Sequence, residues 1–536
     1  MAALDGAAVQ TFTADAKFGD VVSDLELRGW RQLPLTAAGA ALRWRNLALT
    51  DFEGGEVLLN HLEGAQALSH KGSFARLVHD DSAAYYPKCF DARDEDHVAG
   101  MLLYITQVVA AQTLERLLAL DACDGEENGM ALACVEACHL FSSPRQSTRQ
   151  LREALFQLTL WQNYFAPQFV AAYSDDGATP ELADVDALWA AFFQDAPGLS
   201  KTARLGAEAA LQRLASEDVQ RLHAVRGTWL VKPAGGSCGD GIECRASLLG
   251  VVRAAKAAKW RVVVQKYIER PLIILGRKFD VRQWVLVTSV EPLVFFGFSE
   301  CYARFAASDL ADAKLQDKFA HLCNFSIQKD APVRPGNDIP ENMWTSAQLA
   351  AHLSSLGGGD VWSEIVQPQL VAITTSVLRK AAAAGLLRKR ARGFEWLGLD
   401  VMLAQDFSAW LLEVNVSPDV SHSTNVTAAL VPAATRDALA LILDERHADV
   451  PPPLAEAHRL PGFTREPGAP PRWELWFHGD AAPLDIAAHR PTTTQQNFTM
   501  QNHVAEASWN TLHDEIQATV RKAAHTVEAD SDDDEL

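Results

Sequence analysis

The most informative stretch of the chain is FEWLGLDVMLAQDFSAWLLEVNVSP, residues 394–418. Two apolar runs flank a turn signal at residues 405–408, which predicts a β-hairpin. Three side chains that carry oxygen stand inside these apolar strands, namely Asp400, Glu413 and Asn415. Strand side chains alternate between two faces, so Glu413 and Asn415 share a face and the hairpin brings Asp400 beside them. Two carboxylates and an amide oxygen suit Mg²⁺, whereas the alternative is an amphipathic hairpin whose polar side faces solvent.

Length, composition and charge bound the class of the protein. With 536 residues the chain is long enough for several folding units, and 48% hydrophobic with 22% charged residues is the composition of a globular protein. We find no apolar run of about eighteen residues and no secretory signal at the start of the sequence, so neither a membrane span nor secretion is expected. The formal net charge of −20 disfavours nucleic acid as a partner, because such binding depends on neutralising phosphates.

The eight cysteines lack the paired spacing of a zinc site. Cys134 and Cys138 lie four residues apart beside His139, but no second half-site follows, so we expect ordinary helix residues there. Scattered cysteines of this kind are typical of a reducing compartment, and we expect the cytoplasm.

Composition also divides the chain into segments. Helical periodicity is clearest at residues 110–120 and 202–222, and strand signals stand at 228–233, 260–269 and 279–289. We predict a flexible lead at 1–24, an N-terminal and helical region at 25–222, a strand-rich segment at 223–300, a mixed segment with the hairpin at 301–446, and a proline-rich, partly disordered tail at 447–536 with one helix around Trp509.

A glycine-dense loop follows the first strand signal, in TWLVKPAGGSCGDGIEC, residues 228–244. Glycines let backbone N–H groups approach phosphate oxygens without interference from a Cβ, and Lys232 at the end of the strand adds a cation. A flexible surface loop is the alternative. In the next strand a run of valines gives way to residues 265–268, which predicts backbone contacts to the edge of an adenine, unless the strand simply ends before Pro271.

The strand KFDVRQW, residues 278–284, predicts a phosphate-binding face. Alternation puts Lys278, Asp280 and Arg282 on one side of the strand, where two cations beside one acid favour a bound anion. The planar fork of Arg282 suits a γ-phosphate or an acyl phosphate, and Asp280 suits a ribose hydroxyl. Further on, CYARF and HLCNFSIQK supply Arg304, Asn324 and Ser326, each of which is an ordinary surface residue when taken singly.

One basic cluster offers a surface for an acidic partner in spite of the negative net charge. It stands at the end of an alanine-rich helical stretch and consists of Arg379, Lys380, Arg388, Lys389, Arg390 and Arg392. A solvated helix face explains it equally well.

These motifs, two strands with cations followed by an Asp…Glu-x-Asn hairpin, resemble the ATP-grasp fold, and their wording resembles the tubulin tyrosine ligase-like family. The resemblance spans about residues 55–445 and rests on LVKPAGGSCGDGI (230–242), VVQKYIERPLIILGRKFDVRQWVLVT (263–288), YARF (302–305), HLCNFSIQK (321–329) and the hairpin. Within the family, HLCNFSIQK and PENMW (340–344) are most similar to the glycine ligases that initiate side chains on tubulin.

The resemblance implies an α/β (α+β) ATP-grasp fold, in which an N-terminal α/β domain, a central subdomain at 223–300 and a C-terminal subdomain at 301–446 clamp ATP. It implies catalytic roles for Arg282 and Arg304, Mg²⁺ ligation by Asp400, Glu413 and Asn415, and a contact of Ser326 with the amino acid. The implied nucleotide-binding residues are Lys71, Lys232, Cys238, Gly239, Gln265, Lys266, Tyr267, Ile268, Lys278, Phe279, Asp280, Cys323 and Asn324.

The function implied by the resemblance is an ATP-dependent ligase that adds glycine to glutamate side chains of tubulin or axonemal proteins through an acyl phosphate. ATP and Mg²⁺ are the expected cofactors, and tubulin tails and free glycine the expected partners, with no nucleic acid and no membrane. We expect a monomer in the cytoplasm and cytoskeleton, including the axoneme of a cilium or flagellum. A glutamate ligase of the same family and a weakly active or non-catalytic tubulin-binding module remain as alternatives.

One departure from the family pattern concerns the phosphate loop. The family usually places an arginine after the serine of this loop, where this chain has Cys238. A charge-assisted hydrogen bond is worth roughly 1.5–3 kcal/mol. Its loss predicts weaker catalysis and is the reason for keeping the non-catalytic alternative.

Overall fold

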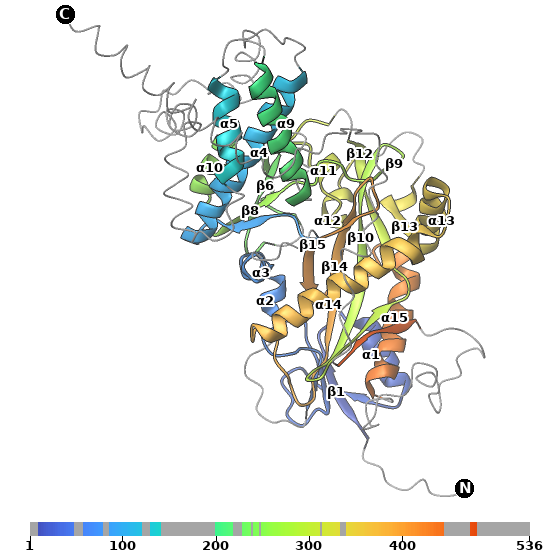
Figure 1. Ribbon diagram of the computed structural model, residues 1–536. Coiled ribbons are helices and arrows are strands. Elements are labelled where there is room, and N and C mark those ends of the chain that lie inside the picture. The colour runs from blue at the N-terminus through green and yellow to red at the C-terminus, as the bar shows by residue number, and fades with distance from the viewer. Residues whose placement is uncertain are drawn as a thin grey trace, which may run out of the picture. The chain divides into compact units, whose positions relative to one another are not determined.

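The computed structural model describes residues 9–47, 57–78, 85–119, 129–140, 199–217, 228–236, 239–245, 248–310, 313–332, 339–443 and 472–479. They form two compact units, whose helices and strands are labelled in Figure 1. Unit 1 takes its described residues from Met1–Tyr86, Ser237–Gly239 and Pro271–Thr492, and unit 2 from Pro87–Gly236 and Asp240–Arg270. Each unit combines helices with β-sheet, which confirms the predicted mixed α/β class.

Unit 1 contains a large antiparallel sheet built around one long strand, β10. The order is β13–β12–β10–β11–β16, and β10 also pairs with β9 and with β14, which in turn pairs with β15. Partners on both edges of β10 satisfy its backbone and bury nearly all of its side chains, as its β-branched and aromatic sequence favours. The strands are β9 Ile273–Ile274, β10 Arg277–Val290, β11 Leu293–Phe298, β12 Tyr302–Asp309, β13 Met343–Thr345, β14 Glu395–Leu403, β15 Ala409–Val416 and β16 Trp473–His478.

A smaller parallel sheet of unit 1, in the order β2–β1–β3–β4, comes from the start of the chain. Its strands are β1 Thr11–Ala14, β2 Arg31–Gln32, β3 Leu42–Trp44 and β4 Leu58–Leu59, with helix α1 at Gly19–Leu27. The expected flexible lead at 1–24 is therefore wrong from residue 11 onward, because Phe12 and Val21 are buried in the core. A strand of four residues has too few alternations to stand out in the sequence.

The helices of unit 1 accompany the large sheet, and α14 lies across β14 and β15 in Figure 1. They are α2 Gln66–Ser69, α3 Lys71–Val78, α11 Lys318–His321, α12 Phe325–Gln328, α13 Ser346–Gly357, α14 Gln367–Ala383 and α15 Asn425–Leu443, with a 3₁₀ turn η3 at Pro340–Asn342 and a π-helical turn η4 at Trp362–Val366. Among the described residues, α15 is the helix long and apolar enough to cross a membrane, but half of it is buried inside the fold. Its Leu430, Val431 and Leu439 pack in one core with Trp44 and Trp396, so α15 is a core helix.

The hairpin predicted from residues 394–418 is confirmed. Strands β14 and β15 pair in a register that sets Asp400 opposite Glu413 and Gly398 opposite Asn415. In the connecting turn, Asp406 Oδ1 accepts hydrogen bonds from the backbone amide and the hydroxyl of Ser408 at 3.0 and 2.6 Å. The predicted proximity of Asp400, Glu413 and Asn415 follows from this register.

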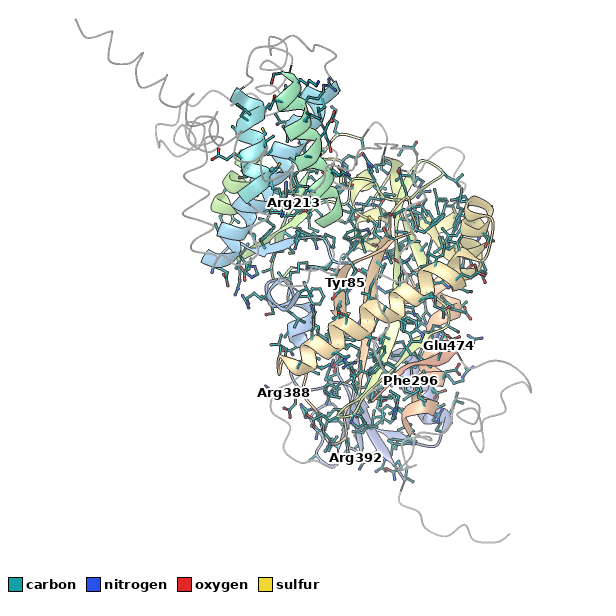
Figure 2. All side chains as sticks on the ribbon, viewed as in Figure 1. Tyr85, Arg213, Phe296, Arg388, Arg392 and Glu474 are labelled. Carbon is teal, nitrogen blue, oxygen red and sulfur yellow. The ribbon has the colours of Figure 1, made fainter. Side chains whose placement is uncertain are left out.

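The segment from residue 447 is not a tail throughout, contrary to the prediction. Strand β16 pairs with β11, and Figure 2 shows Phe296 of β11 close to Glu474 of β16. The ring of Phe477 stacks on Phe295 at 5.7 Å, and Trp473 is 5% exposed. The proline-rich segment 451–471 indicated that the folded core ends before it. A single strand of six residues has too little alternation in its sequence to contradict that interpretation. Residues 451–471 and the predicted helix around Trp509 lie outside the described residues.

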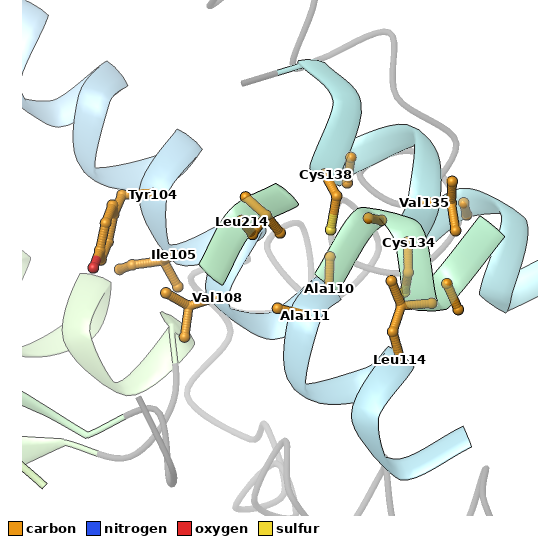
Figure 3. Packing of buried hydrophobic residues seen from close by; sticks show 14 of the residues in the cluster. Tyr104, Ile105, Val108, Ala110, Ala111, Leu114, Cys134, Val135, Cys138 and Leu214 are labelled. Atoms are coloured by element: carbon orange, nitrogen blue, oxygen red, sulfur yellow. The ribbon is translucent and has the colours of Figure 1, made fainter. Parts of the chain in front are cut away.

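Unit 2 pairs a helical bundle with a four-stranded antiparallel sheet in the order β5–β8–β6–β7. Its elements are β5 Cys89–Asp91, α4 Glu95–Ala119, α5 Gly129–Leu140, α9 Lys201–Glu217, β6 Trp229–Pro233, β7 Glu243–Arg245, α10 Leu248–Ala257 and β8 Val262–Lys266. Figure 3 shows Leu114, Cys134 and Leu214 in the packing of α4, α5 and α9. Burial raises the pKa of the Cys134 thiol well above its ordinary value, so Cys134 and Cys138 are core residues as predicted.

Candidate active site

Four charged side chains on three strands of unit 1 form what we call the buried ion network. Asp280 and Arg282 of β10, Arg304 of β12 and Asp400 of β14 are each 7% exposed or less. Arg304 binds Asp280 with both arms of its fork, Nε to Oδ1 at 2.7 Å and Nη2 to Oδ2 at 2.8 Å. Asp400 receives Arg282 Nε on Oδ1 at 2.5 Å and Arg304 Nη2 on Oδ2 at 3.0 Å. Negative and positive side chains therefore alternate along the contacts that run from Asp280 through Arg304 and Asp400 to Arg282.

Strand register explains this arrangement. Asp280 pairs with Arg304 across β10 and β12, and Arg282 pairs with Asp400 across β10 and β14. Asp280 and Arg282 are two residues apart on β10, so their side chains project from the same face. The shared face predicted for residues 278–284 is confirmed for these two positions, and the sheet topology adds the partners.

The two aspartates of the network differ in their protonation. Burial alone raises the pKa of Asp400, but the positive charges of Arg282 and Arg304 outweigh burial and hold that pKa well below its usual value. At Asp280 burial is the larger effect and raises the pKa, although Arg304 opposes it. Asp400 is consequently the carboxylate that keeps its negative charge most firmly.

One predicted metal ligand, Asp400, belongs to this network, and the other two, Glu413 and Asn415, lie beside it on β15. Asn415 Nδ2 is 3.2 Å from Asp400 Oδ2, and Lys71 Nζ is 3.5 Å from Glu413 Oε2. The donor set fits Mg²⁺, because two carboxylates and an amide oxygen are ligands of a hard cation and Asp400 is held in the ionised form that metal binding needs. In the part of the chain that the structure describes, no three His, Cys, Asp or Glu side chains gather into a metal site, so the amide of Asn415 is needed to complete the set.

Lys278, Asn324 and Gly239, which are predicted nucleotide residues, also belong to unit 1. Lys278 Nζ donates to the backbone oxygen of His321 at 2.8 Å. Gly239 has a φ of +78°, and a Cβ there would lie 2.6 Å from Ile327 Cδ1 and 3.1 Å from Asn324 Oδ1. Gly239 thus lies against Asn324 and α12 at a position that glycine alone fits, and Ser326 lies on the same short helix.

Lys232 and Gln265, two of the predicted nucleotide residues in unit 2, contact each other on neighbouring strands. Lys232 Nζ on β6 donates to Gln265 Oε1 on β8 at 2.5 Å, and both side chains are buried. Strand pairing sets Leu230 opposite Gln265, which brings Lys232 within reach. The glutamine therefore orients the ammonium group at the start of the glycine-dense loop.

Lys266 is held inside unit 2. Its ammonium group donates to the backbone oxygens of Thr228 and Tyr267 at 2.9 and 3.1 Å and also binds the carboxylate of Glu269. The amides of Lys266 and Tyr267 already donate to the backbone oxygens of Lys88 and Thr228. Contacts of this segment with an adenine would have to come from its other backbone groups.

Three further predicted nucleotide residues present no side-chain group to a ligand. Phe279 is fully buried against Phe305, with 5.3 Å between the ring centroids. Burial raises the pKa of the Cys323 thiol to about 12, and Ile268 is an apolar buried residue. Cys238 lies outside the described residues.

One polar cluster next to the site was not predicted from the sequence: the buried side chains of His61 and Glu395, with the partly buried Ser417 in contact with His61. Glu395 is 0% exposed and hydrogen-bonded to His61. A charged residue at the start of an apolar strand, five positions before Asp400, was the available signal.

Comparison with known proteins agrees with the motifs. Residues 195–457 match the sequence model of the tubulin-tyrosine ligase family. The tubulin monoglycylase TTLL3 of Danio rerio is 41% identical over 228 residues, 41% of this chain and 29% of the relative. The tubulin glycylase 3D of Tetrahymena thermophila is 38% identical over 219 residues, 40% of this chain and 21% of the relative. The protein monoglycylase TTLL8 of Mus musculus is 37% identical over 254 residues, 45% of this chain and 29% of the relative.

The chain therefore spans less than a third of the length of each of these relatives. The matches confirm the resemblance that the motifs indicated, and the fold of the matched region is ATP-grasp-like. Strand β16 and the parallel sheet β1–β4 lie outside the matched residues.

Proposed function

Residues 195–457 carry the sequence of the tubulin-tyrosine ligase family, and from this premise we propose that the protein is an ATP-dependent ligase that adds glycine to glutamate side chains of tubulin or axonemal proteins. The observation that carries the proposal is the buried ion network beside Glu413 and Asn415. Fixed cations next to ionised carboxylates are suited to phosphoryl transfer, in which negative charge must be stabilised. Glycine as the donor is supported by the similarity to proteins named glycylases.

The proposed reaction has two steps. A glutamate side-chain carboxylate of the target attacks the γ-phosphorus of ATP, so that an O–P bond forms, the bond to the β-phosphate oxygen breaks and ADP leaves. The amine of glycine then attacks the carbonyl carbon of the acyl phosphate. A C–N bond forms, the C–O bond breaks, phosphate leaves and the amine releases a proton. No nucleophilic side chain of the protein is required.

Arg282 and Arg304 stabilise the charge on the transferred phosphoryl group in this proposal. Burial lowers the pKa of each guanidinium, but the carboxylates outweigh burial and raise it, so that both stay charged. Asp280 and Asp400 hold the two forks in place before ATP binds. Such preorganised charge acts without reorganisation during the reaction, which is the usual source of electrostatic catalysis.

We also propose that the reaction uses Mg²⁺ and that Asp400, Glu413 and Asn415 would hold it. When bound, Mg²⁺ neutralises phosphate charge and orients the phosphates. The ammonium group of Lys71, 3.5 Å from Glu413 Oε2, limits the repulsion between the carboxylates.

The nucleotide contacts are assigned through the resemblance to the family. Lys278, Asn324, Gly239 and Lys232 keep the nucleotide-binding role that the resemblance implies. The side chains of Phe279 and Cys323 are buried, so we assign them a supporting role, in which they pack against neighbouring groups. Ser326 is the proposed contact for the amino acid.

The proposed acceptor is supported by the names of the relatives, which are tubulin and protein glycylases. We place it on acidic tails of tubulin, which implies action on the cytoskeleton and in the axoneme of a cilium or flagellum. Within this chain the basic cluster at residues 379–392 supplies the complementary charge.

The test supplies purified protein with ATP, microtubules and either ¹⁴C-glycine or ¹⁴C-glutamate. We expect ATP-dependent incorporation of glycine into tubulin, and no incorporation with Glu413→Gln. Incorporation of glutamate instead of glycine would replace the proposal by a glutamate ligase. If the protein sediments with microtubules but incorporates neither labelled amino acid, it is a binding module.

A further inference from the structure

A second buried polar group borders the hairpin, and the reaction proposed above does not use it. His61 is 5% exposed, and Glu395, the first residue of β14, is 0% exposed. Glu395 Oε1 lies 2.9 Å from His61 Nδ1, and Glu395 Oε2 accepts from the amide of Leu62 at 2.9 Å. On the other side of the ring, His61 Nε2 lies 2.9 Å from the backbone oxygen of Arg45 and 3.3 Å from Ser417 Oγ.

The contacts run from Ser417 through His61 to Glu395 as in a hydrolase triad, but the contact of His61 with the backbone oxygen of Arg45 argues against this chemistry. A backbone oxygen only accepts hydrogen bonds, so the contact with Arg45 requires a hydrogen on His61 Nε2. A protonated Nε2 has no lone pair that could take the hydroxyl proton of Ser417. The imidazole therefore donates toward Arg45 and Ser417, while Glu395 fixes its orientation through Nδ1.

The contact with Ser417 matters because of its place in the chain. Ser417 directly follows β15, and the predicted ligands Glu413 and Asn415 are on that strand. Its φ of +53° is a left-handed conformation that is unfavourable for a non-glycine residue and persists only where the surroundings enforce it. Two contacts hold Ser417 in this conformation. His61 Nε2 contacts Ser417 Oγ, and Lys17 Nζ lies 3.4 Å from the backbone oxygen of Ser417.

His61 is itself anchored firmly. The neighbouring Asn60 makes two hydrogen bonds of 2.7 Å with the backbone of Arg45, which continue the pairing of β3 and β4. Trp44 and Trp396 line an apolar pocket next to Asn60 and Ser417. In such low-dielectric surroundings hydrogen bonds are stronger than in water, so the imidazole is a rigid link between the parallel sheet and the end of β15.

We propose that His61 is a positioning residue for the metal ligands on β15. Held by Glu395 and Arg45, it fixes Ser417 and thereby the direction in which Glu413 and Asn415 present their oxygens. The inference rests on the proposed function, since it concerns the Mg²⁺ that this function requires. Loss of supporting contacts around a metal site typically costs 10- to 100-fold in metal affinity.

The test measures metal affinity directly. Mn²⁺, which binds oxygen ligands and is visible by electron paramagnetic resonance, is titrated into the full chain with a non-hydrolysable ATP analogue. We expect His61→Phe, which keeps a ring but donates no hydrogen bond, to weaken Mn²⁺ binding roughly 10- to 100-fold. Ser417→Ala removes the acceptor with little risk to folding and should have a similar effect. The double variant should bind Mn²⁺ no more weakly than the single variant with the lower affinity, because both changes break the same contact between His61 and Ser417.

Leu353→Ala is the control, because it removes buried side-chain volume from α13 and none of the hydrogen bonds that hold His61 or Ser417. We expect a lower melting temperature and unchanged Mn²⁺ affinity. Equal loss of affinity in Leu353→Ala would indicate general loosening and overturn the proposal, as would wild-type affinity in both His61→Phe and Ser417→Ala. Absence of Mn²⁺ binding by the wild-type chain would instead overturn the metal assignment in the proposed function and this inference with it.

Discussion

Arg282 and Asp400 face each other across the paired strands β10 and β14, with Arg282 Nε 2.5 Å from Asp400 Oδ1. Asp400 is also opposite Glu413 on β15, so one carboxylate orients a cation and stands among the proposed metal ligands. Breaking a buried ion pair costs about 3–5 kcal/mol. Substitutions at Arg282 or Asp400 would therefore disturb folding as well as chemistry, and Glu413, whose side chain is 29% exposed, is the better position for a functional test.

We predict that Glu413→Gln reduces ATP-dependent ligation at least 100-fold, because the change removes one ligand charge, and metal ions contribute several kcal/mol of charge stabilisation. The melting temperature should stay near that of the wild type, since glutamine fills the same volume at a partly exposed site. Asp406→Asn, in the turn of the same hairpin, is the control and should keep activity. Unchanged ligation by Glu413→Gln would remove the metal assignment.

The glycine-dense loop can be tested at Gly239. Gly239→Ala should raise the KM for ATP, because its Cβ would lie 2.6 Å from Ile327 Cδ1 and push the loop away from Asn324. Adding Ile327→Ala removes the colliding atom and should restore part of the affinity. Steady-state kinetics with varied ATP measures both.

Gly39→Ala separates crowding from backbone strain at Gly239. Gly39 has a φ of +81°, close to the +78° of Gly239, but no atom lies within 4 Å of the position that a Cβ would take there. We expect a small loss of stability and an unchanged KM for ATP in Gly39→Ala. If Gly239→Ala has the same mild effect, the loop does not depend on its contact with α12.

Much of the candidate site was predictable because alternation along a strand determines which side chains share a face. The hairpin of residues 394–418 and the face that carries Asp280 and Arg282 follow from local sequence alone. The partner of Arg282 does not follow from local sequence. Asp400 is 118 residues away and lies next to Arg282 only because β14 pairs with β10 in the sheet. The side-chain partner of Lys266 was not predicted, although Glu269 is only three residues away, because the segment 265–268 was interpreted through its backbone groups; its contact with the nucleotide stays a prediction.

The short strands were the least predictable part of the fold. Strands β1 and β16 have four and six residues, and each acquires its stability from pairing with a distant segment. Local pattern cannot report that pairing, which is why the lead and the tail were extended too far.

A pH dependence of stability is expected from Glu395. Burial raises its pKa, with His61 opposing, so the folded protein holds this proton to a higher pH than the unfolded chain, where the pKa is about 4.3. The wild type should therefore lose stability relative to Glu395→Gln as the pH rises from about 4.3 through the folded pKa. Melting temperatures of both proteins at stepped pH values measure this difference, and parallel curves would contradict the pKa shift.

Strand β16 should be essential for stability although it lies beyond the residues that match the family. A chain that ends at residue 457 loses the buried side chains of Trp473 and Phe477, whose burial contributes roughly 3–6 kcal/mol together. It also leaves the edge of β11 unpaired and prone to aggregation. A chain that ends at residue 479 is the control and should melt at a higher temperature than the chain that ends at residue 457. Equal stability of the two chains would show that β16 adds nothing to the core.

The basic cluster offers a test of substrate attraction, and Figure 2 shows Arg388 and Arg392 in the connection between α14 and β14. The side chain of Arg388 is 62% exposed and lies 3.4 Å from Glu63, a surface pair worth at most about 1 kcal/mol. Arg388→Gln with Lys389→Gln should weaken microtubule binding and flatten its salt dependence, because charges act on a docking tail within a Debye length of roughly 8–10 Å.

Glu63→Gln gives a prediction of opposite sign at the same place. It removes the acid beside Arg388 and should strengthen microtubule binding at low salt, while ATP affinity stays constant in all these variants. Arg390 is left unchanged, because its side chain packs against Gly393 and its loss would disturb the connection. Cosedimentation at several salt concentrations measures the affinities. If neither the double change nor Glu63→Gln alters binding, the cluster is a solvated surface and the acceptor docks elsewhere.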